Sequence, residues 1–355
     1  RDEVTATLER HQDNEDLARK ALRGFRRREL LRIALSSMVA VSDIERVGQA
    51  LTDLSRAFLE GVLALARADA EGIEFAMIAM GRLGGSELSF GSDLDVVYVF
   101  RDIGAGDNAH VIAEGIVKDV ARLSEDLLFP VDLDAGLRPE GKNGPIVRSL
   151  DAYAAYYERW ALGWEAQALL RAAEYVGDES LTRDFLDMAA PYRYPESWGE
   201  DKAREIRRIK ARVEAERLPQ GVDGSRHLKL GRGSLSDVEW AVQLLQLRHG
   251  HTHPEIRTAS TLGALAVLEE CGLLQAGDAA QLRDAWLLAS RIRTALALFG
   301  EPTIDVLPGD RAGLEGAARL MGYPPRSASV LEENYLKVTR RSRAVFERVF
   351  YETSA

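Results

Sequence analysis

An apolar run, a glycine-rich turn and two alternating aspartates follow one another between Glu74 and Phe100, and this stretch constrains the fold most strongly. The apolar run, from Phe75 to Met80, predicts a buried strand. The residues from Gly81 to Ser86 are too rich in glycine to continue that strand. A β-rich run from Asp93 to Phe100 then predicts a second strand, so we expect a strand pair joined through a tight turn.

Groups that could bind a metal ion and a phosphate lie at this turn. Asp93 and Asp95 alternate, so both carboxylates project from one face at the start of the second strand. Neighbouring carboxylates repel unless a cation lies between them, and Mg²⁺, a hard ion with oxygen ligands, suits them best. Because glycine lets the main chain approach a phosphate, the N–H groups of Gly84, Gly85 and Ser86 could cradle one. The combination predicts a metal-assisted phosphoryl or nucleotidyl transfer site; the alternative is a tight turn whose acids are only solvated.

A third carboxylate is expected further along the chain. Two-metal nucleotidyl transfer needs an acid that binds the ion nearest the attacking oxygen or accepts its proton. The run from Phe129 to Asp134 predicts another strand, on which Asp132 and Asp134 share a face, so either could supply this acid. Arg138, just beyond, is a candidate for a structural or a phosphate-facing cation.

A second glycine-containing loop runs from Lys229 to Ser234. It opens a predicted helix whose first turn carries Asp237 and Glu239, and Ser234 or Ser236 could cap that helix. A basic residue before a helix N-terminus suits an anionic ligand. Acids in a first turn are also ordinary complements of the helix dipole, so a purely structural loop is the alternative.

The motifs around the paired aspartates resemble those of a known family. Gly84-Gly85-Ser86 followed by Ser92-Asp93-Leu94-Asp95 is similar to the signature of the polymerase-β-like nucleotidyltransferases. The longer string from Met80 to Phe100 resembles one branch, the glutamine synthetase adenylyltransferase/adenylyl-removing enzymes. Three further segments resemble this branch: Ala21 to Leu35, Trp164 to Leu169, and Lys229 to Trp240 with Ser234 in place of a glycine. One departure is Ala173, which replaces the second arginine of a family triplet that begins here at Arg171.

The resemblance implies a role for each matching residue. Asp134 stands where the family's D-x-x-L-R-P motif has its acid, so it would join Asp93 and Asp95 as a catalytic, metal-binding residue. Two Mg²⁺ ions and ATP are the implied cofactor and substrate. The other matching residues are implied to bind the nucleotide: Gly84, Gly85, Ser86, Ser92, Arg138, Lys229 and Glu239.

The resemblance also implies an activity. The family's enzymes hold two nucleotidyltransferase halves in one longer, multifunctional polypeptide that controls nitrogen assimilation. One half transfers AMP from ATP to a tyrosine hydroxyl of glutamine synthetase and releases pyrophosphate; the other removes the AMP by phosphorolysis, giving ADP. Asp237, in Ser236-Asp237-Val238-Glu239, resembles the C-terminal, adenylylating half, and several motifs are actinobacterial in style.

Glutamine synthetase is the partner that this resemblance implies, and a PII-class signal protein is a candidate regulator. The chain would then be a part of a longer polypeptide with two halves. Two other activities stay open as alternatives. One is the deadenylylation of glutamine synthetase, and the other is nucleotidyl transfer to a small molecule.

Composition narrows the class of protein. The net charge of −10 argues against a nucleic-acid partner, because phosphate backbones are held by clustered lysine and arginine. The single cysteine, Cys271, excludes an internal disulfide and suits the cytoplasm. No apolar run approaches the roughly 20 residues that cross a bilayer, so we expect no membrane association. His249, His251 and His253 alternate, but without an accompanying carboxylate or cysteine cluster we expect an exposed helix end rather than a metal site.

We therefore predict an α+β protein with a small mixed-sheet nucleotidyltransferase core, an N-terminal helical extension and a C-terminal helical bundle. The expected parts are the extension at 1–70, the core at 71–150, connecting helices at 151–198 and the bundle at 199–355. Pro191 to Trp198 is the expected linker, and no strand is expected beyond Ser149. The arginine runs at 26–28 and 207–212 are expected to be solvated faces; phosphate binding, through Arg208 or Lys210 in the second run, is the alternative.

Overall fold

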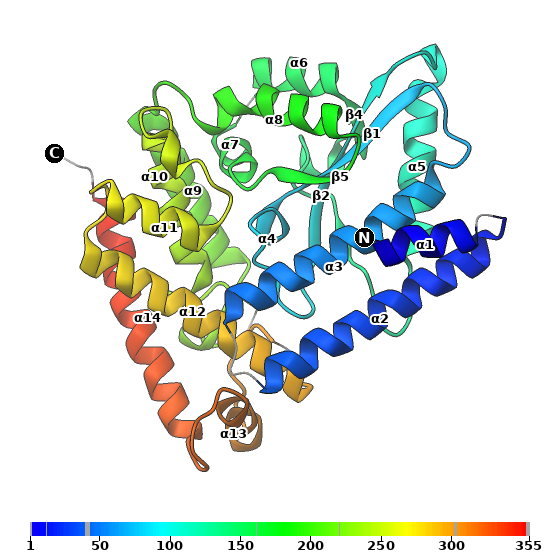
Figure 1. The fold of residues 1–355 in the computed structure, drawn as a ribbon. Helices are drawn as coiled ribbons and strands as arrows, with labels where there is room; N and C mark the ends of the chain where they lie inside the picture. The colour runs from blue at the N-terminus through cyan, green and yellow to red at the C-terminus, as the bar shows by residue number, and fades with distance from the viewer. Residues whose placement is uncertain are drawn as a thin grey trace. The chain divides into compact units, whose positions relative to one another are not determined.

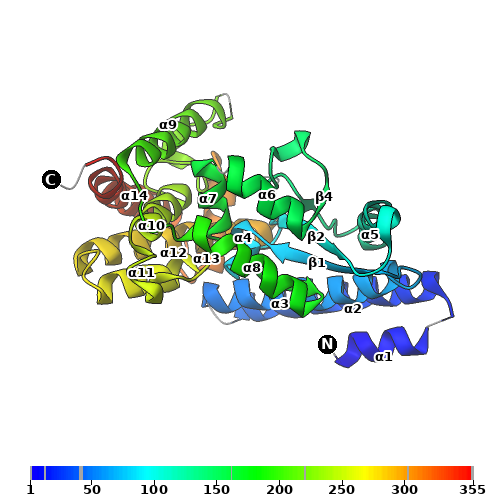
Figure 2. The same cartoon turned by 90° about the horizontal axis from the view of Figure 1, so that it is seen from above.

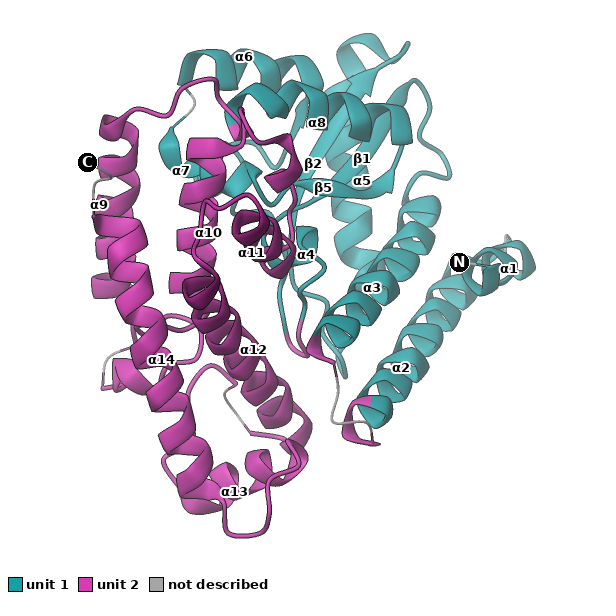
Figure 3. Cartoon of the chain, turned by 60° about the vertical axis from the view of Figure 1, so that its left-hand side comes forward, with its two compact units in different colours: residues 1–36, 45–88, 92–192 teal, residues 37–44, 89–91, 193–355 magenta. Residues whose placement is uncertain are grey.

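The computed structural model describes residues 2–11, 13–39, 43–160, 162–219, 221–301 and 304–352. The chain divides into two compact units (Figure 3). Unit 1 comprises residues 1–36, 45–88 and 92–192, and unit 2 comprises residues 37–44, 89–91 and 193–355. The helices that follow the sheet strands, up to Tyr192, therefore belong to the sheet-bearing unit.

Unit 1 is built on a mixed sheet (Figure 1), which confirms the α+β prediction. Strand β1 (Ile73–Ala79) pairs antiparallel with β2 (Leu94–Asp102) on one side and with β5 (Ala173–Gly177) on the other. The outer edge of β2 pairs in parallel with β3 (Leu133–Asp134) near its start and with β4 (Val147–Ser149) further along. The sheet thus brings the start of β2 beside β3.

Two predictions about strands are wrong. Strand β5 lies beyond Ser149, where none was expected, because its five residues are too few and too mixed to show a periodicity. The strand expected to begin at Phe129 begins only at Leu133. The backbone N–H groups of Leu128 and Phe129 donate to the Asp126 carboxylate instead, which turns the chain before it can join the sheet.

Helices cover both faces of this sheet (Figure 2). On one face, α6 (Leu150–Trp160) and α8 (Glu179–Arg193) pack with α7 (Gly163–Leu169) against a fully buried apolar cluster. The sheet contributes Ala76, Ile78, Val97 and Val99 to this cluster, and Met80, which follows β1, also belongs to it. On the other face lies α5 (Ala109–Ser124), whose His110 ring stands 5.9 Å from the ring of Phe100. Alternate residues of β2 therefore face opposite helical layers, as the strand period requires.

The expected linker starts later than predicted. Pro191 lies inside α8, and the irregular segment follows Arg193. Pro191 lacks the N–H that would continue the helical hydrogen bonds, and α8 ends two residues later, at Arg193, rather than at the proline itself.

The N-terminal extension consists of α1 (Asp2–Arg10), α2 (Glu15–Val39) and α3 (Ile44–Ala66), all helical as predicted. Its arginine triplet is not simply solvated. Arg26 donates to the carbonyl oxygens of Phe129 and Pro130, at 2.6 and 3.3 Å, and Arg27 holds Asp126 through two hydrogen bonds. Arg26 and Arg27 thus hold the segment that leads into β3 against α2.

Unit 2 is helical. Its helices are α9 (Glu200–Glu216), α10 (Leu235–His249), α11 (Thr261–Glu270), α12 (Ala276–Phe299), α13 (Arg311–Leu320) and α14 (Ala328–Tyr351). Helices α10, α12 and α14 supply much of its core, including Leu244, Ile292 and Phe346. Across the described ranges, no helix combines the length and the hydrophobicity that spanning a membrane requires.

Candidate active site

The sheet register brings two of the predicted catalytic aspartates together. Asp95 on β2 and Asp134 on β3 are paired residues of neighbouring parallel strands, so their side chains leave the same face of the sheet at the same level. Adjacent strands lie about 4.8 Å apart. Asp93 immediately precedes β2 and is exposed, whereas Asp95 and Asp134 are partly buried. Three carboxylates thus gather where β2 and β3 begin.

The same register separates Asp134 from Asp132. Asp132 lies before β3 and is exposed, and its carbonyl oxygen accepts a hydrogen bond from the Leu94 N–H at 2.8 Å. The Asp134 carboxylate is oriented by the Gly136 N–H, which donates to Oδ1 at 2.7 Å. The geometry therefore favours Asp134 over Asp132 as the partner of Asp95.

The glycine-rich turn lies directly against Asp95. Residues Gly81–Gly84 form a single helical turn, α4, between β1 and the approach to β2. Gly81 has a φ of 50°, and a Cβ there would lie 2.1 Å from Asp95 Oδ2. Only glycine leaves room for this carboxylate, and a carboxylate set of this kind fits a hard divalent ion with oxygen ligands.

The three N–H groups predicted to form a phosphate cradle already donate to carbonyl groups of this turn. The N–H groups of Gly84, Gly85 and Ser86 donate to Met80, Gly81 and Leu83 carbonyl oxygens, respectively, within the turn. Gly84 is glycine for a packing reason, because a Cβ there would lie 1.8 Å from the Arg171 carbonyl oxygen. Ser86 has a φ of 56°, which is uncommon for serine and typical of functional sites under backbone strain.

A buried ion pair between Arg171 and Glu87 stabilises this turn. Arg171 donates through Nε to the Gly81 carbonyl oxygen at 2.9 Å and forms an ion pair with Glu87, and both side chains are buried. Arg82 donates to the Glu87 carbonyl oxygen at 2.9 Å. Glu87 was missed by the sequence reasoning, because a single glutamate after a serine carries no pattern. The ion pair explains why an arginine stands at position 171.

Two roles were predicted for Arg138, a structural one and a phosphate-facing one, and its contacts favour the structural role. Its guanidinium donates to the carbonyl oxygens of Ala135, Lys142, Gly144 and Pro145 at 2.8–3.2 Å, and the side chain is buried. A guanidinium committed to so many carbonyl groups closes the loop after β3 rather than facing a phosphate.

The second glycine loop is packed within unit 2. Gly233 has a φ of 75°, and a Cβ there would lie 1.8 Å from the Thr339 carbonyl oxygen. Ser234 precedes α10, but its hydroxyl donates to the Leu228 carbonyl oxygen rather than capping the helix, and it accepts from Tyr335 at 3.1 Å. Lys229 is exposed on this loop, and Glu239 is partly buried one turn into α10.

The charged residues behind this loop form a buried network, so the solvated-face interpretation is wrong for Lys210. The Lys210 ammonium lies 2.6 Å from Asp237 and 3.1 Å from Glu214, and Lys210 and Asp237 are both fully buried. Arg343 of α14 lies 2.9 Å from Asp237, whose carboxylate also accepts the Gly233 N–H at 2.6 Å. Although burial raises the pKa of Glu214, Lys210 and Arg343 hold it below its ordinary value. Lys210 therefore ties α9 to the loop and is not available to a triphosphate.

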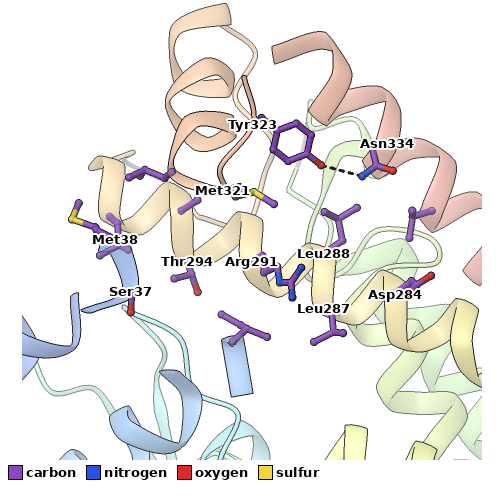
Figure 4. Close-up of a pocket in the computed structure, with 15 residues that line it drawn as sticks. Ser37, Met38, Asp284, Leu287, Leu288, Arg291, Thr294, Met321, Tyr323 and Asn334 are labelled. Carbon is purple, nitrogen blue, oxygen red and sulfur yellow. Dashed lines mark hydrogen bonds between the residues drawn. The ribbon is translucent and has the colours of Figure 1, made fainter. Parts of the chain in front are cut away.

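Two cavities lie within single units, and neither is lined by a predicted site residue. One, of about 330 Å³ in unit 2, lies between the end of α2, α12 and α14 (Figure 4). Its lining mixes polar and apolar side chains: Arg291 and Asp284 of α12 contribute charge, and Tyr323 accepts a hydrogen bond from Asn334 at 3.1 Å. The other, of about 470 Å³ in unit 1, lies between α3, β5 and α8.

Comparisons with known proteins match both parts of the chain. Residues 1–188 match the family model described as glutamate-ammonia ligase adenylyltransferase, and residues 206–350 match one described as PII-uridylyltransferase.

Curated relatives match nearly the whole chain. It is 58% identical to a bifunctional glutamine synthetase adenylyltransferase/adenylyl-removing enzyme of Leifsonia xyli, over 99% of this chain and 35% of that protein. Enzymes of the same name from Streptomyces avermitilis and Mycobacterium leprae are 45% and 46% identical, over 98% and 93% of this chain and 37% and 34% of theirs. The chain therefore spans about a third of the length of these relatives.

Proposed function

The chain belongs to the glutamate-ammonia ligase adenylyltransferase family, and from this we propose that it transfers AMP from ATP to a tyrosine hydroxyl of glutamine synthetase. The relatives are named for both an adenylylating and an adenylyl-removing activity, and this chain corresponds to about a third of their length. The proposal assigns the adenylylating activity to this chain, in the cytoplasm.

The observation that carries the proposal is the pairing of Asp95 with Asp134 beside Gly81. Two carboxylates held at one level, with a third on Asp93, would repel one another without a cation, so the sheet maintains an arrangement that a divalent ion would stabilise. Asp93, Asp95 and Asp134 are the residues that would hold two Mg²⁺ ions. Bound there, the ions would neutralise charge on the triphosphate and make the nucleophile more acidic.

The chain's own residues then account for the rest of the reaction. The tyrosine oxygen attacks the α-phosphorus of ATP in line, the bond to the β-phosphate oxygen breaks, and pyrophosphate leaves. Asp134, oriented by the Gly136 N–H, accepts the tyrosine proton. Gly81 keeps Asp95 in place, and the Arg171–Glu87 pair keeps Gly81 in place.

We assign nucleotide contacts to side chains rather than to the turn's amides. Ser86, strained at the end of α4, and Ser92, just before Asp93, contribute hydroxyls. For Lys229 and Glu239, nucleotide binding is proposed from the family resemblance alone. Gly84, Gly85 and Arg138 act by shaping the turn and the loop that flank the aspartates.

The direction of the reaction is tested by supplying each possible substrate separately. The protein is incubated with Mg²⁺, ATP and unmodified glutamine synthetase, and in parallel with phosphate and AMP-modified glutamine synthetase. We expect a mass gain of one AMP in the first reaction and no ADP in the second. ADP formation from the modified protein would instead assign the phosphorolytic activity.

A regulatory partner is a second, separate proposal. Residues 206–350 match the PII-uridylyltransferase model, which supports a PII-class signal protein as a regulator of this chain. The first reaction above, repeated with and without a PII protein, tests it. A rate that does not change at saturating PII would contradict this part of the proposal alone.

A further inference from the structure

Three metal-ligating side chains of different types meet on unit 2, far along the chain from the aspartates. One ligand atom from each of His253, Glu255 and Cys271 lies within 4.8 Å of the other two. His253 Nδ1 stands 3.2 Å from Glu255 Oε1, and Cys271 Sγ stands 3.3 Å from the same oxygen. An exposed helix end was expected at these histidines because no carboxylate or cysteine cluster accompanied them; the fold brings Cys271 to His253 and its sequence neighbour Glu255.

The backbone holds His253 and Cys271 at the ends of helical segments, and Glu255 lies two residues after His253. His253 precedes the short helix η4 (Pro254–Ile256), and its N–H donates to the His249 carbonyl oxygen at 2.8 Å. Cys271 follows α11, and its N–H donates to the Val267 carbonyl oxygen at 2.9 Å. Gln246 of α10 holds the end of η4 and the loop that follows it, because its side-chain amide donates to the carbonyl oxygens of Ile256 and Thr258 at 2.8 Å. The cluster is therefore built by ordered backbone.

Two of the three separations are close to those within a tetrahedral zinc site. With Zn–N and Zn–O bonds of about 2.0–2.1 Å and a Zn–S bond of about 2.3 Å, tetrahedral ligand atoms lie about 3.3–3.6 Å apart. The His253–Glu255 and Cys271–Glu255 contacts, 3.2 and 3.3 Å, are near this spacing, and the ligand atoms of His253 and Cys271 lie within 4.8 Å of each other. The donor set excludes Mg²⁺ as the preferred ion, because a thiolate and an imidazole favour borderline and soft metals.

We propose that His253, Glu255 and Cys271 form a zinc-binding site that links the η4 turn to the C-terminus of α11, with water in the fourth position. Binding replaces the thiol proton of Cys271 by a sulfur–zinc bond and releases that proton to the buffer. The neutral His253 imidazole contributes its Nδ1 lone pair, and Glu255 contributes one carboxylate oxygen. The partial exposure of all three side chains gives the ion a path from solvent.

The test measures zinc binding to the full chain, without a polyhistidine tag and without ATP or Mg²⁺. Calorimetric titration in two buffers of different protonation enthalpy reports affinity and proton release. Because Cys271 is the single cysteine, alkylation of its thiol reports zinc binding at this site alone. Zinc should protect the thiol, and Co²⁺ should give a thiolate charge-transfer band.

Variants separate this site from adventitious zinc. Cys271→Ser and His253→Ala should each weaken zinc binding by roughly tenfold or more and abolish proton release or the cobalt band. His251→Ala is the matched control, because His251 is an exposed histidine of the same loop outside the cluster. Zinc affinity unchanged in Cys271→Ser, or reduced equally in His251→Ala, would overturn the proposal. Neither outcome bears on AMP transfer, which Asp134→Asn tests independently.

Discussion

Asp95 and Asp134 face one another across the short parallel pairing of β2 with β3, although they lie 39 positions apart in the chain. The pairing involves only Leu94–Leu133 and Asp95–Asp134, so a two-residue strand places the third carboxylate. Residues on α2 hold the segment that leads into this strand, through Arg26 and Arg27. The aspartate arrangement therefore depends on the N-terminal extension as well as on the sheet.

The first prediction separates Asp134 from its neighbour Asp132. Asp134→Asn should lower the rate of AMP transfer by roughly a hundredfold or more, because it removes a proton acceptor and an anionic ligand at the paired position. Asp132→Asn, which alters an exposed carboxylate outside β3, should stay within severalfold of the wild type. Rates measured with labelled ATP, alongside circular dichroism of each variant, check both expectations. Equal losses of activity in the two variants would mean that the β2–β3 register does not determine which aspartate is catalytic.

The second prediction concerns Gly81. Gly81→Ala adds a Cβ where Asp95 Oδ2 lies, and it also places alanine in left-handed backbone, which costs about 1–2 kcal/mol. Gly106→Ala carries the same backbone cost, with a φ of 59°, but its Cβ meets open space. Both variants should lose similar stability in urea unfolding, whereas only Gly81→Ala should lose most of its AMP-transfer activity. Full activity in Gly81→Ala would show that Asp95 can move without consequence.

The third prediction tests the buried network of unit 2. Asp237→Asn leaves the buried Lys210 and the partly buried Arg343 with one carboxylate, Glu214, between them, and breaking a buried ion pair such as Lys210–Asp237 costs ~3–5 kcal/mol. Asp201→Asn removes an exposed partner of Arg204 and should change stability by less than about 1 kcal/mol. Chemical denaturation monitored by tryptophan fluorescence distinguishes the two. A loss for Asp237→Asn no larger than that for Asp201→Asn would contradict the network's structural role.

The fourth prediction concerns acid stability through Asp126. Hydrogen bonds from Arg27 hold the pKa of Asp126 well below its ordinary value, against the opposing effect of burial. A depressed folded pKa stabilises the protein above the unfolded pKa of about 3.9, and this contribution is lost as the pH falls towards the folded pKa. The melting temperature of Asp126→Asn should therefore lie below that of the wild type from pH 7 to 5, and the gap should narrow below about pH 4. A gap that widens on acidification would show the opposite sign of linkage.

Local patterns predicted the elements whose side chains repeat regularly. The apolar run of β1 and the alternation of β2 identified the centre of the sheet, and the helical periodicities of α2, α3 and α12 were equally clear. Strand β5 was missed because its burial comes from pairing with β1 and not from a pattern of its own. The strand predicted at β3 was too long. The sequence does not show that the Leu128 and Phe129 N–H groups donate to the Asp126 carboxylate.

The sequence predicted the carboxylates of the candidate site but not the contacts that hold them in place. Asp93 and Asp95 follow from local alternation, whereas the position of Asp134 beside them needs the parallel pairing of β3. Gly84 and Gly85 looked like a phosphate cradle, but contact with Arg171 and hydrogen bonds inside the turn explain them. Glu87, Arg343 and the His253–Cys271 meeting are contacts between distant segments, which no single-sequence spacing encodes.

The central claim is that the paired aspartates form a divalent-ion site, and direct ion binding tests it without relying on turnover. Mn²⁺ titration followed by electron paramagnetic resonance, in the presence of a non-hydrolysable ATP analogue, measures binding to the wild type, Asp95→Asn, Asp134→Asn and Asp132→Asn. We predict that Asp95→Asn and Asp134→Asn lose the bound Mn²⁺ signal while Asp132→Asn retains it. Wild-type Mn²⁺ binding in Asp95→Asn or Asp134→Asn would contradict the account.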